Sequence, residues 1–265
     1  MLQEPILGQL GDGLERAGLL EEVRRALDHL EPPLGTVFER SKVPLNKWLL
    51  ASYLMASSKK GISAHQIHRT LGVTYKTAWF MTMRLREAMS DDALPALLGG
   101  PGEIVEADET YWGHPKAAAH AWHHKEKIVS LVERGGDVRS FHVDKVTKDT
   151  LTRIMKSNID PRSRIMTDEA SYYDWTKKHF ASHETVSHKQ HEYSRGDVSS
   201  NTIEGFFSIV KRGLVGTFHH VDPKHLFRYL DEFDFRYNAR DISDEQRMLL
   251  ALKGIAHKRL TYHEC

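Results

Sequence analysis

The stretch Ile104–His114, IVEADETYWGH, begins as an apolar strand and then places three acids, Glu106, Asp108 and Glu109, beside an aromatic pair. The apolar residues at the start of this stretch, followed by the turn signal Gly113, predict a buried strand. Carboxylates in a buried strand need either a raised pKa or a compensating cation. We therefore interpret the strand as a rigid support that holds Asp108 for chemistry.

Further strands and helices follow this stretch and predict an α/β domain. Gly99–Glu103, GGPGE, is the most plausible boundary before it. Strands, then a helix, then a strand and more helices describe a mixed sheet with flanking helices. The expected elements are strands at Ile104–Tyr111, Lys127–Glu133 and Val138–Val143, a helix at Thr147–Ser157, a strand at Ser163–Thr167, and helices in the remainder.

Three acids form the candidate catalytic site. Asp108 and Asp168 each lie near the end of a short apolar strand, so two neighbouring strands would bring both to one sheet edge. Glu204 lies on a predicted helix, where Asn201 and Lys211 share its face at spacings of three and seven residues. A pair of Mg²⁺ ions would compensate such carboxylates and support phosphodiester chemistry. Taken one at a time, each acid is also compatible with an ordinary surface turn.

The N-terminal third carries an uneven charge. Residues 1–40 hold eight acids and four bases and include a predicted acidic helix, whereas residues 41–90 hold eight bases and one acid, a net charge of +7. Residues 59–89 predict two helices joined by a short turn, with Ser63 and Thr74 as N-caps and Gly72 at the turn. This helix-turn-helix pattern in a basic block predicts DNA binding. The candidate DNA contacts are Lys59, Lys60, Tyr75, Lys76, Thr77 and Arg84.

Four motifs in order, VEADETYWG, IMTDEASYY, NTIEGFFSIVKRGLVGTFHHV and KHLFRYLDEFDFRYNAR, closely resemble the bacterial insertion-sequence DDE transposases of the ISXO-like family. The resemblance covers roughly residues 34–240 and implies an RNase H-like catalytic domain. It implies that Asp108, Asp168 and Glu204 bind the metal, with Asn201 and Lys211 accompanying Glu204. The implied cofactor is Mg²⁺, with Mn²⁺ as a substitute, as two ions. The implied partners are double-stranded DNA, as transposon ends and target, and further copies of the chain assembled on it.

This chain departs from the family at its N-terminus. Family members usually begin with a zinc ribbon of paired cysteines, but the only cysteine here is Cys265. Either the helix-turn-helix recognises the DNA ends, or the chain is a catalytically impaired, transposase-derived DNA-binding protein. A nonspecific RNase H-like nuclease is a third reading.

The expected organisation is an acidic helical segment (1–40), a helix-turn-helix region (41–98), a catalytic domain (99–245) and a C-terminal tail (246–265). No apolar run approaches the roughly 20 residues needed to cross a bilayer, and the N-terminus lacks the features of a secretory signal. We therefore expect a cytoplasmic, nucleoid-associated protein without membrane partners.

Overall fold

The computed structural model describes residues 36–90, 96–113, 125–168, 171–186, 199–255 and 258–262. The predicted helix near the N-terminus lies outside these ranges. The first described helices are α2 (Leu45–Ser57), α3 (Ala64–Leu71) and α4 (Tyr75–Met89). Ser63 caps α3 by accepting a hydrogen bond from the backbone N–H of Gln66, and Thr74 caps α4 through that of Thr77. Gly72 ends α3 with a φ of 59°, a left-handed conformation that glycine adopts without strain.

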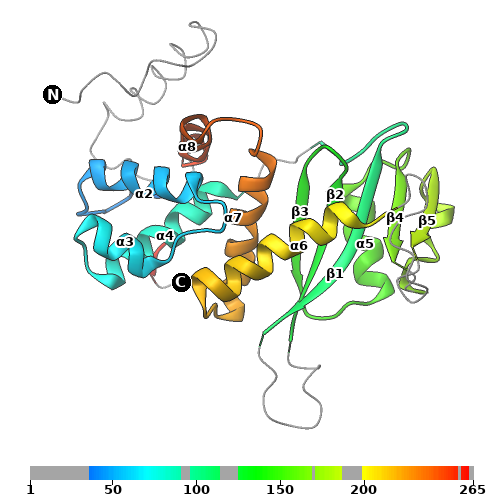
Figure 1. Ribbon diagram of the computed structural model, residues 1–265, viewed down its shortest axis with the longest axis horizontal. Helices are drawn as coiled ribbons and strands as arrows, with labels where there is room; N and C mark the ends of the chain where they lie inside the picture. Colours follow the sequence, from blue (N-terminus) through cyan, green and yellow to red (C-terminus); the bar gives the residue numbers. More distant parts are fainter. Residues whose placement is uncertain are drawn as a thin grey trace, which may run out of the picture.

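A five-stranded mixed sheet forms the other half of the molecule (Figure 1). Its spatial order is β3-β2-β1-β4-β5. β1 pairs antiparallel with β2, which pairs antiparallel with β3, whereas β4 runs parallel to both β1 and β5. The strands are β1 (Ile104–Trp112), β2 (Glu126–Glu133), β3 (Val138–Val143), β4 (Arg164–Asp168) and β5 (Ser182–Val186).

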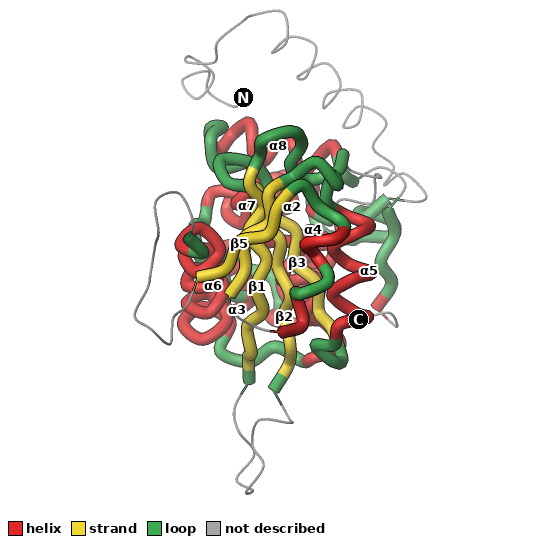
Figure 2. Tube along the Cα trace, turned by 90° about the vertical axis from the view of Figure 1, so that its right-hand side faces the viewer, coloured by secondary structure: helices red, strands yellow, loops and turns green. Residues whose placement is uncertain are grey.

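Helices cover both faces of this sheet, as Figure 2 shows. Side chains of β2 alternate between the faces. Val129 and Leu131 pack in the core with α5 (Lys148–Asn158). Ile128 and Val132 pack in a second core with α6 (Asn201–Gly213) and α7 (Leu226–Asn238). The predicted α/β class with a mixed sheet and flanking helices is confirmed.

Helix α4 contributes to two cores. Its residues Ala78, Met81 and Leu85 are buried among α2 and α3. Met83 points to the other side and joins the core formed with α6 and α7. The helical region is therefore packed continuously onto the α/β half.

Two expectations for the C-terminal half are wrong. Residues 182–186 form the edge strand β5, which was missed because SHETV is short and mostly polar. The expected tail from residue 246 instead begins within α8 (Asp244–Lys253), which has a capping box at Ser243 and Gln246. Ala251 and Ile255 are buried in the core of α2–α4, because the chain after α7 returns to the helical region.

Short helical turns complete the described fold. These are the 3₁₀ turns Ser171–Tyr173, Thr176–Lys178 and Pro223–His225, and a π-helical turn, Leu214–Phe218, that continues α6. Within the described ranges, no helix combines the length and the apolar character needed to cross a membrane.

Candidate active site

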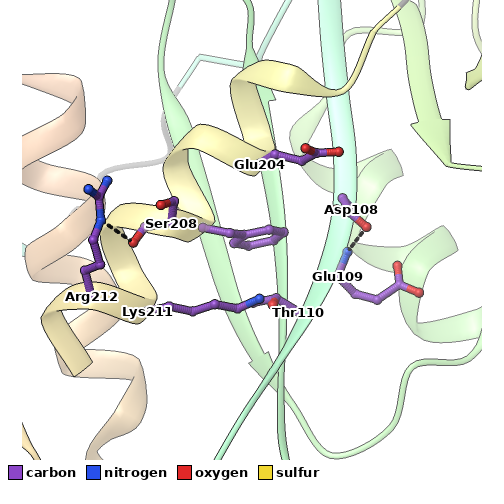
Figure 3. A pocket seen from close by; sticks show the side chains of 8 residues that line it. Asp108, Glu109, Thr110, Glu204, Ser208, Lys211 and Arg212 are labelled. Carbon is purple, nitrogen blue, oxygen red and sulfur yellow. Dashed lines mark hydrogen bonds between the residues drawn. The ribbon is translucent and has the colours of Figure 1, made fainter. Parts of the chain in front are cut away.

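A pocket of ≈ 430 Å³ lies between strand β1 and helix α6 (Figure 3). Strand β1 contributes Asp108, Glu109 and Thr110 to it. Helix α6 turns its polar face to the same space, because its apolar residues face the sheet. The lining residues from α6 are Glu204, Phe207, Ser208, Lys211 and Arg212.

Asp168 lies at the end of β4, the parallel neighbour of β1. The two strands are paired as far as Glu106 and Met166, and the charge of Asp168 raises the pKa of Asp108, two residues further along β1. Asp168 is not among the residues that line the pocket. Glu204 reaches the site from α6 and accepts a hydrogen bond from the hydroxyl of Ser200 at 3.2 Å.

Burial and neighbouring charges perturb the carboxylates of β1. Burial is the largest cause that raises the pKa of Asp108 to about 7, and the charges of Asp168, Glu109 and Glu204 act in the same direction. The backbone N–H of Glu109, which donates to Oδ1 of Asp108 at 2.7 Å, lowers the pKa. Burial also raises the pKa of Glu109, whereas the hydroxyl of Tyr173, which donates to its Oε2 at 2.8 Å, lowers it. The pocket therefore concentrates negative charge and favours a bound cation.

Oxygen donors of this kind fit a hard divalent cation such as Mg²⁺. The carboxylates do not yet form a closed coordination site: among the described residues, no three His, Cys, Asp or Glu side chains are grouped closely enough to hold a metal ion. Mg²⁺ commonly keeps several waters and takes only one or two carboxylates together with substrate phosphate. The donor set therefore fits a metal that is shared with a phosphate group of a substrate.

Glu106 has a role that the sequence reading missed. Its side chain is fully buried, and Oε1 accepts hydrogen bonds from Arg134 at 2.7 and 3.0 Å. Oε2 accepts from the backbone N–H of Ile203 at 2.9 Å, in the first turn of α6. Arg134 also donates to the carbonyl oxygen and the hydroxyl of Ser199.

This ion pair fixes the start of the helix that carries Glu204. The side chain of the N-cap residue Ser200 makes no cap hydrogen bond to α6, and Glu106 supplies an acceptor for the first turn from β1. In the sequence, the signal for this role of Glu106 was its position, two residues before Asp108 and on the same side of the strand. That spacing does not reveal which backbone group the carboxylate meets.

The two residues expected to accompany Glu204 are placed differently. Lys211 lines the pocket two helical turns after Glu204. Asn201 is the first residue of α6, is exposed and does not line the pocket. Its predicted role stays a prediction.

The predicted DNA contacts lie mostly on the surface. Lys59 and Lys60 are exposed in the turn after α2. Tyr75 and Lys76 are exposed in the first turn of α4, and the hydroxyl of Thr77 lies 2.8 Å from that of Thr74. These five positions stay candidate DNA contacts.

The structure corrects the prediction that Arg84 contacts DNA. Its side chain is buried, and it donates to the backbone carbonyls of Leu260 at 3.0 Å and Glu39 at 2.9 Å. Because α4 turns this residue toward the C-terminal segment, Arg84 joins chain segments and is not presented to DNA.

Two basic residues of α7, Arg228 and Arg236, are buried. Arg236 and Arg86 both donate to the fully buried carboxylate of Glu232. Arg228 is likewise buried and pairs with Glu87 at 3.1 Å. The basic spacing along α7 therefore reflects ion pairs with α4 and with α7 itself.

Comparisons with known proteins agree on one family. Residues 97–238 match the model of the ISXO2-like transposase domain. A protein of Halobacterium salinarum, described as an uncharacterized protein in transposable element ISH50, is 29% identical over 221 residues, which cover 76% of this chain and 72% of the relative.

Two solved structures share weaker similarity. The simian T-cell lymphotropic virus intasome in complex with a PP2A regulatory subunit matches with 17% identity and a TM-score of 0.31, over 76% of this chain and 67% of that chain. The Mos1 strand transfer complex matches with 13% identity and a TM-score of 0.32, over 94% and 84%.

Proposed function

This chain belongs to the ISXO2-like transposase domain family, and on that premise we propose that it cuts DNA at the ends of an insertion sequence and joins the freed ends to target DNA. The observation that carries this proposal is the pocket lined by Asp108, Glu109 and Glu204, where the charges of Asp168 and Glu204 help to raise the pKa of Asp108. A site that accumulates negative charge suits a reaction whose substrate is a phosphodiester only when cations neutralise that charge.

Asp108, Asp168 and Glu204 are the residues that would hold Mg²⁺, or Mn²⁺ in its place, as one or two ions. Bound metal would supply activation of the attacking oxygen and neutralisation of charge on the phosphate. Lys211, on the wall of the same pocket, would contact a phosphate oxygen of the DNA. The Glu106–Arg134 pair keeps the first turn of α6, and with it Glu204, against β1.

The DNA substrate is double-stranded, at the element's ends and at the target. The surface candidates for holding it are Lys59, Lys60, Tyr75, Lys76 and Thr77. Joining two ends in one event requires at least two active sites, so we include assembly of several copies on DNA in this proposal. Such a reaction would take place on chromosomal DNA.

A strand-transfer assay tests the proposal. It would combine purified protein, a supercoiled target plasmid, Mg²⁺ or Mn²⁺, and duplexes copied from the inverted repeats that flank the coding region. We expect joined product from the wild type and from Asp144→Ala, a matched change at an exposed aspartate outside the pocket. Asp108→Ala and Asp168→Ala should bind the duplex without cutting it, and a chelator should stop the wild type.

A second candidate is a DNA-binding protein derived from a transposase that no longer cuts. The absence of a closed three-ligand cluster among the described residues favours it. The same assay separates the two, because this alternative requires the wild type to bind the duplexes and yet give no cut or joined product with either metal. Cutting without joining, and without preference for the repeats, would instead indicate a nonspecific nuclease.

A further inference from the structure

The exposed turn that carries Lys59 and Lys60 is packed directly against the far end of α6. A Cβ atom on Gly213, the last residue of α6, would lie 2.8 Å from the carbonyl oxygen of Lys60. A Cβ atom on Gly61 would lie 2.3 Å from Cζ of Phe218, in the π-helical turn that follows α6. Two glycines thus allow an approach that any side chain would prevent. Figure 1 shows α6 reaching from the sheet to this helical region.

The outer face of α6 between the pocket and this turn is basic. Its exposed residues after Glu204 include Ser208, Lys211 and Arg212. Residues 205–221 contain no acid, so no carboxylate from this segment opposes an anion there. Lys59, Lys60 and Lys211 are exposed, and among the described residues none of them forms an ion pair.

We propose that the DNA strand bound in the pocket between β1 and α6 continues along the exposed face of α6, and that Lys59 and Lys60 bind its phosphate backbone. This inference rests on the proposed function and adds the course of the DNA. From Glu204 to Gly213 the helix advances nine residues (213 − 204), or about 13 Å at ~1.5 Å per residue. A duplex lying beside α6 advances ~3.4 Å per base step. The turn that carries Lys59 and Lys60, called the lysine turn below, would therefore contact phosphates about four steps from the cleaved bond.

The partner is the backbone, without sequence preference at this contact. Lysine ammonium groups are flexible point charges that suit phosphates, and the turn presents no planar side chain to read a base edge. The close packing at Gly61 and Gly213 gives the contact a fixed distance from the pocket. The lysine turn would therefore set the register of the cleaved bond as well as contribute to affinity.

The first test compares two lysine pairs. Lys59→Gln/Lys60→Gln removes the pair on the proposed path, and Lys177→Gln/Lys178→Gln removes an exposed pair beside β5, at the other end of the molecule. Binding to insertion-end duplexes is measured by fluorescence anisotropy, without divalent metal, between 50 and 200 mM salt. Loss of two phosphate contacts should lower the slope of log affinity against log salt by about 1.8.

Over this salt range the wild type should therefore lose about tenfold more affinity than the first variant, and the same amount as the second. Equal slopes for wild type and Lys59→Gln/Lys60→Gln overturn the inference. Because cutting and joining by the wild type are scored separately, that result leaves the proposed function intact. A wild type that binds no duplex overturns both.

The second test locates the contact. Single phosphates of the duplex are replaced in turn by neutral methylphosphonates. In the wild type, replacement about four steps from the cleaved bond should weaken binding, whereas in Lys59→Gln/Lys60→Gln it should have no further effect. Two results would contradict a path along α6. One is that the phosphate whose replacement weakens binding lies more than about eight steps from the cleaved bond. The other is that replacement at the expected position weakens binding by Lys59→Gln/Lys60→Gln as much as it weakens binding by the wild type.

Discussion

Replacement of Glu106 by glutamine tests how the buried ion pair positions α6. In the wild type one carboxylate oxygen meets Arg134 and the other meets the backbone N–H of Ile203. Glutamine keeps the size of the side chain and one acceptor, but it turns an amide N–H₂ toward Arg134 or Ile203 and removes the charge. One donor is therefore left facing another inside the protein.

The structure sets the size of the effect. Removing one partner from a buried ion pair costs about 3–5 kcal/mol. The Arg134 side chain is 27% exposed, so water partly solvates its charge and we expect a loss near the lower end, about 3 kcal/mol. Glu184→Gln is the matched control, since Glu184 pairs with Arg164 at 2.8 Å in the same sheet, with about a third of each side chain exposed. Its cost should be below about 1 kcal/mol because solvent screens the pair.

Urea denaturation of both variants at neutral pH measures this difference. A gap of about 2 kcal/mol between their free energies of unfolding would support the positioning role of Glu106. Glu106→Asp, which retains the charge on a shorter side chain, should fall between the wild type and Glu106→Gln. Equal losses for Glu106→Gln and Glu184→Gln would refute the reasoning, because the buried pair would then contribute no more than a half-solvated one.

Two further predictions concern other internal contacts. Burial raises the pKa of Asp234 from an ordinary value of 3.8 to about 7, although Ser140 donates to both carboxylate oxygens. The folded state therefore binds the proton more tightly, and this group makes the protein lose stability as the pH rises from about 4 through 7. Asp234→Asn should flatten that part of the stability profile in urea titrations at several pH values, and an unchanged profile would contradict this. Arg84→Met should lower the free energy of unfolding by about 1–3 kcal/mol, since the carbonyls of Leu260 and Glu39 lose their donor. The salt dependence of DNA binding should not change in this variant. A smaller slope of log affinity against log salt would instead indicate that Arg84 contacts DNA.

Most of the fold was accessible from local patterns. Helices α3 and α4 begin at the predicted N-caps Ser63 and Thr74, and β3 has its predicted bounds. These segments have clear periodicity and are bounded by strong turn signals. Strand β5 lacked both, because a short polar edge strand is stabilised by its neighbour β4 more than by its own composition.

The candidate site was predictable where it depended on strand ends and helix spacing. Asp168 acts on the pKa of Asp108 because β1 and β4 are parallel neighbours, and Glu204 and Lys211 line the same pocket from one helix. The roles of Glu106 and Arg84 depend on partners distant in sequence, Ile203 for the first and Leu260 for the second. One sequence does not specify such long-range pairings.

The packing of α4 on both sides has a consequence for how such proteins can be recombined. Met81 and Leu85 belong to the core of the helical region, whereas Met83 belongs to the core that α6 and α7 share with the sheet. A segment transplanted from a relative at residues 41–98 would leave mismatched side chains in both interiors at once. Chimeras made at this boundary should be unstable. Single changes at exposed positions such as Tyr75 and Lys76, which belong to neither core, should disturb neither interior.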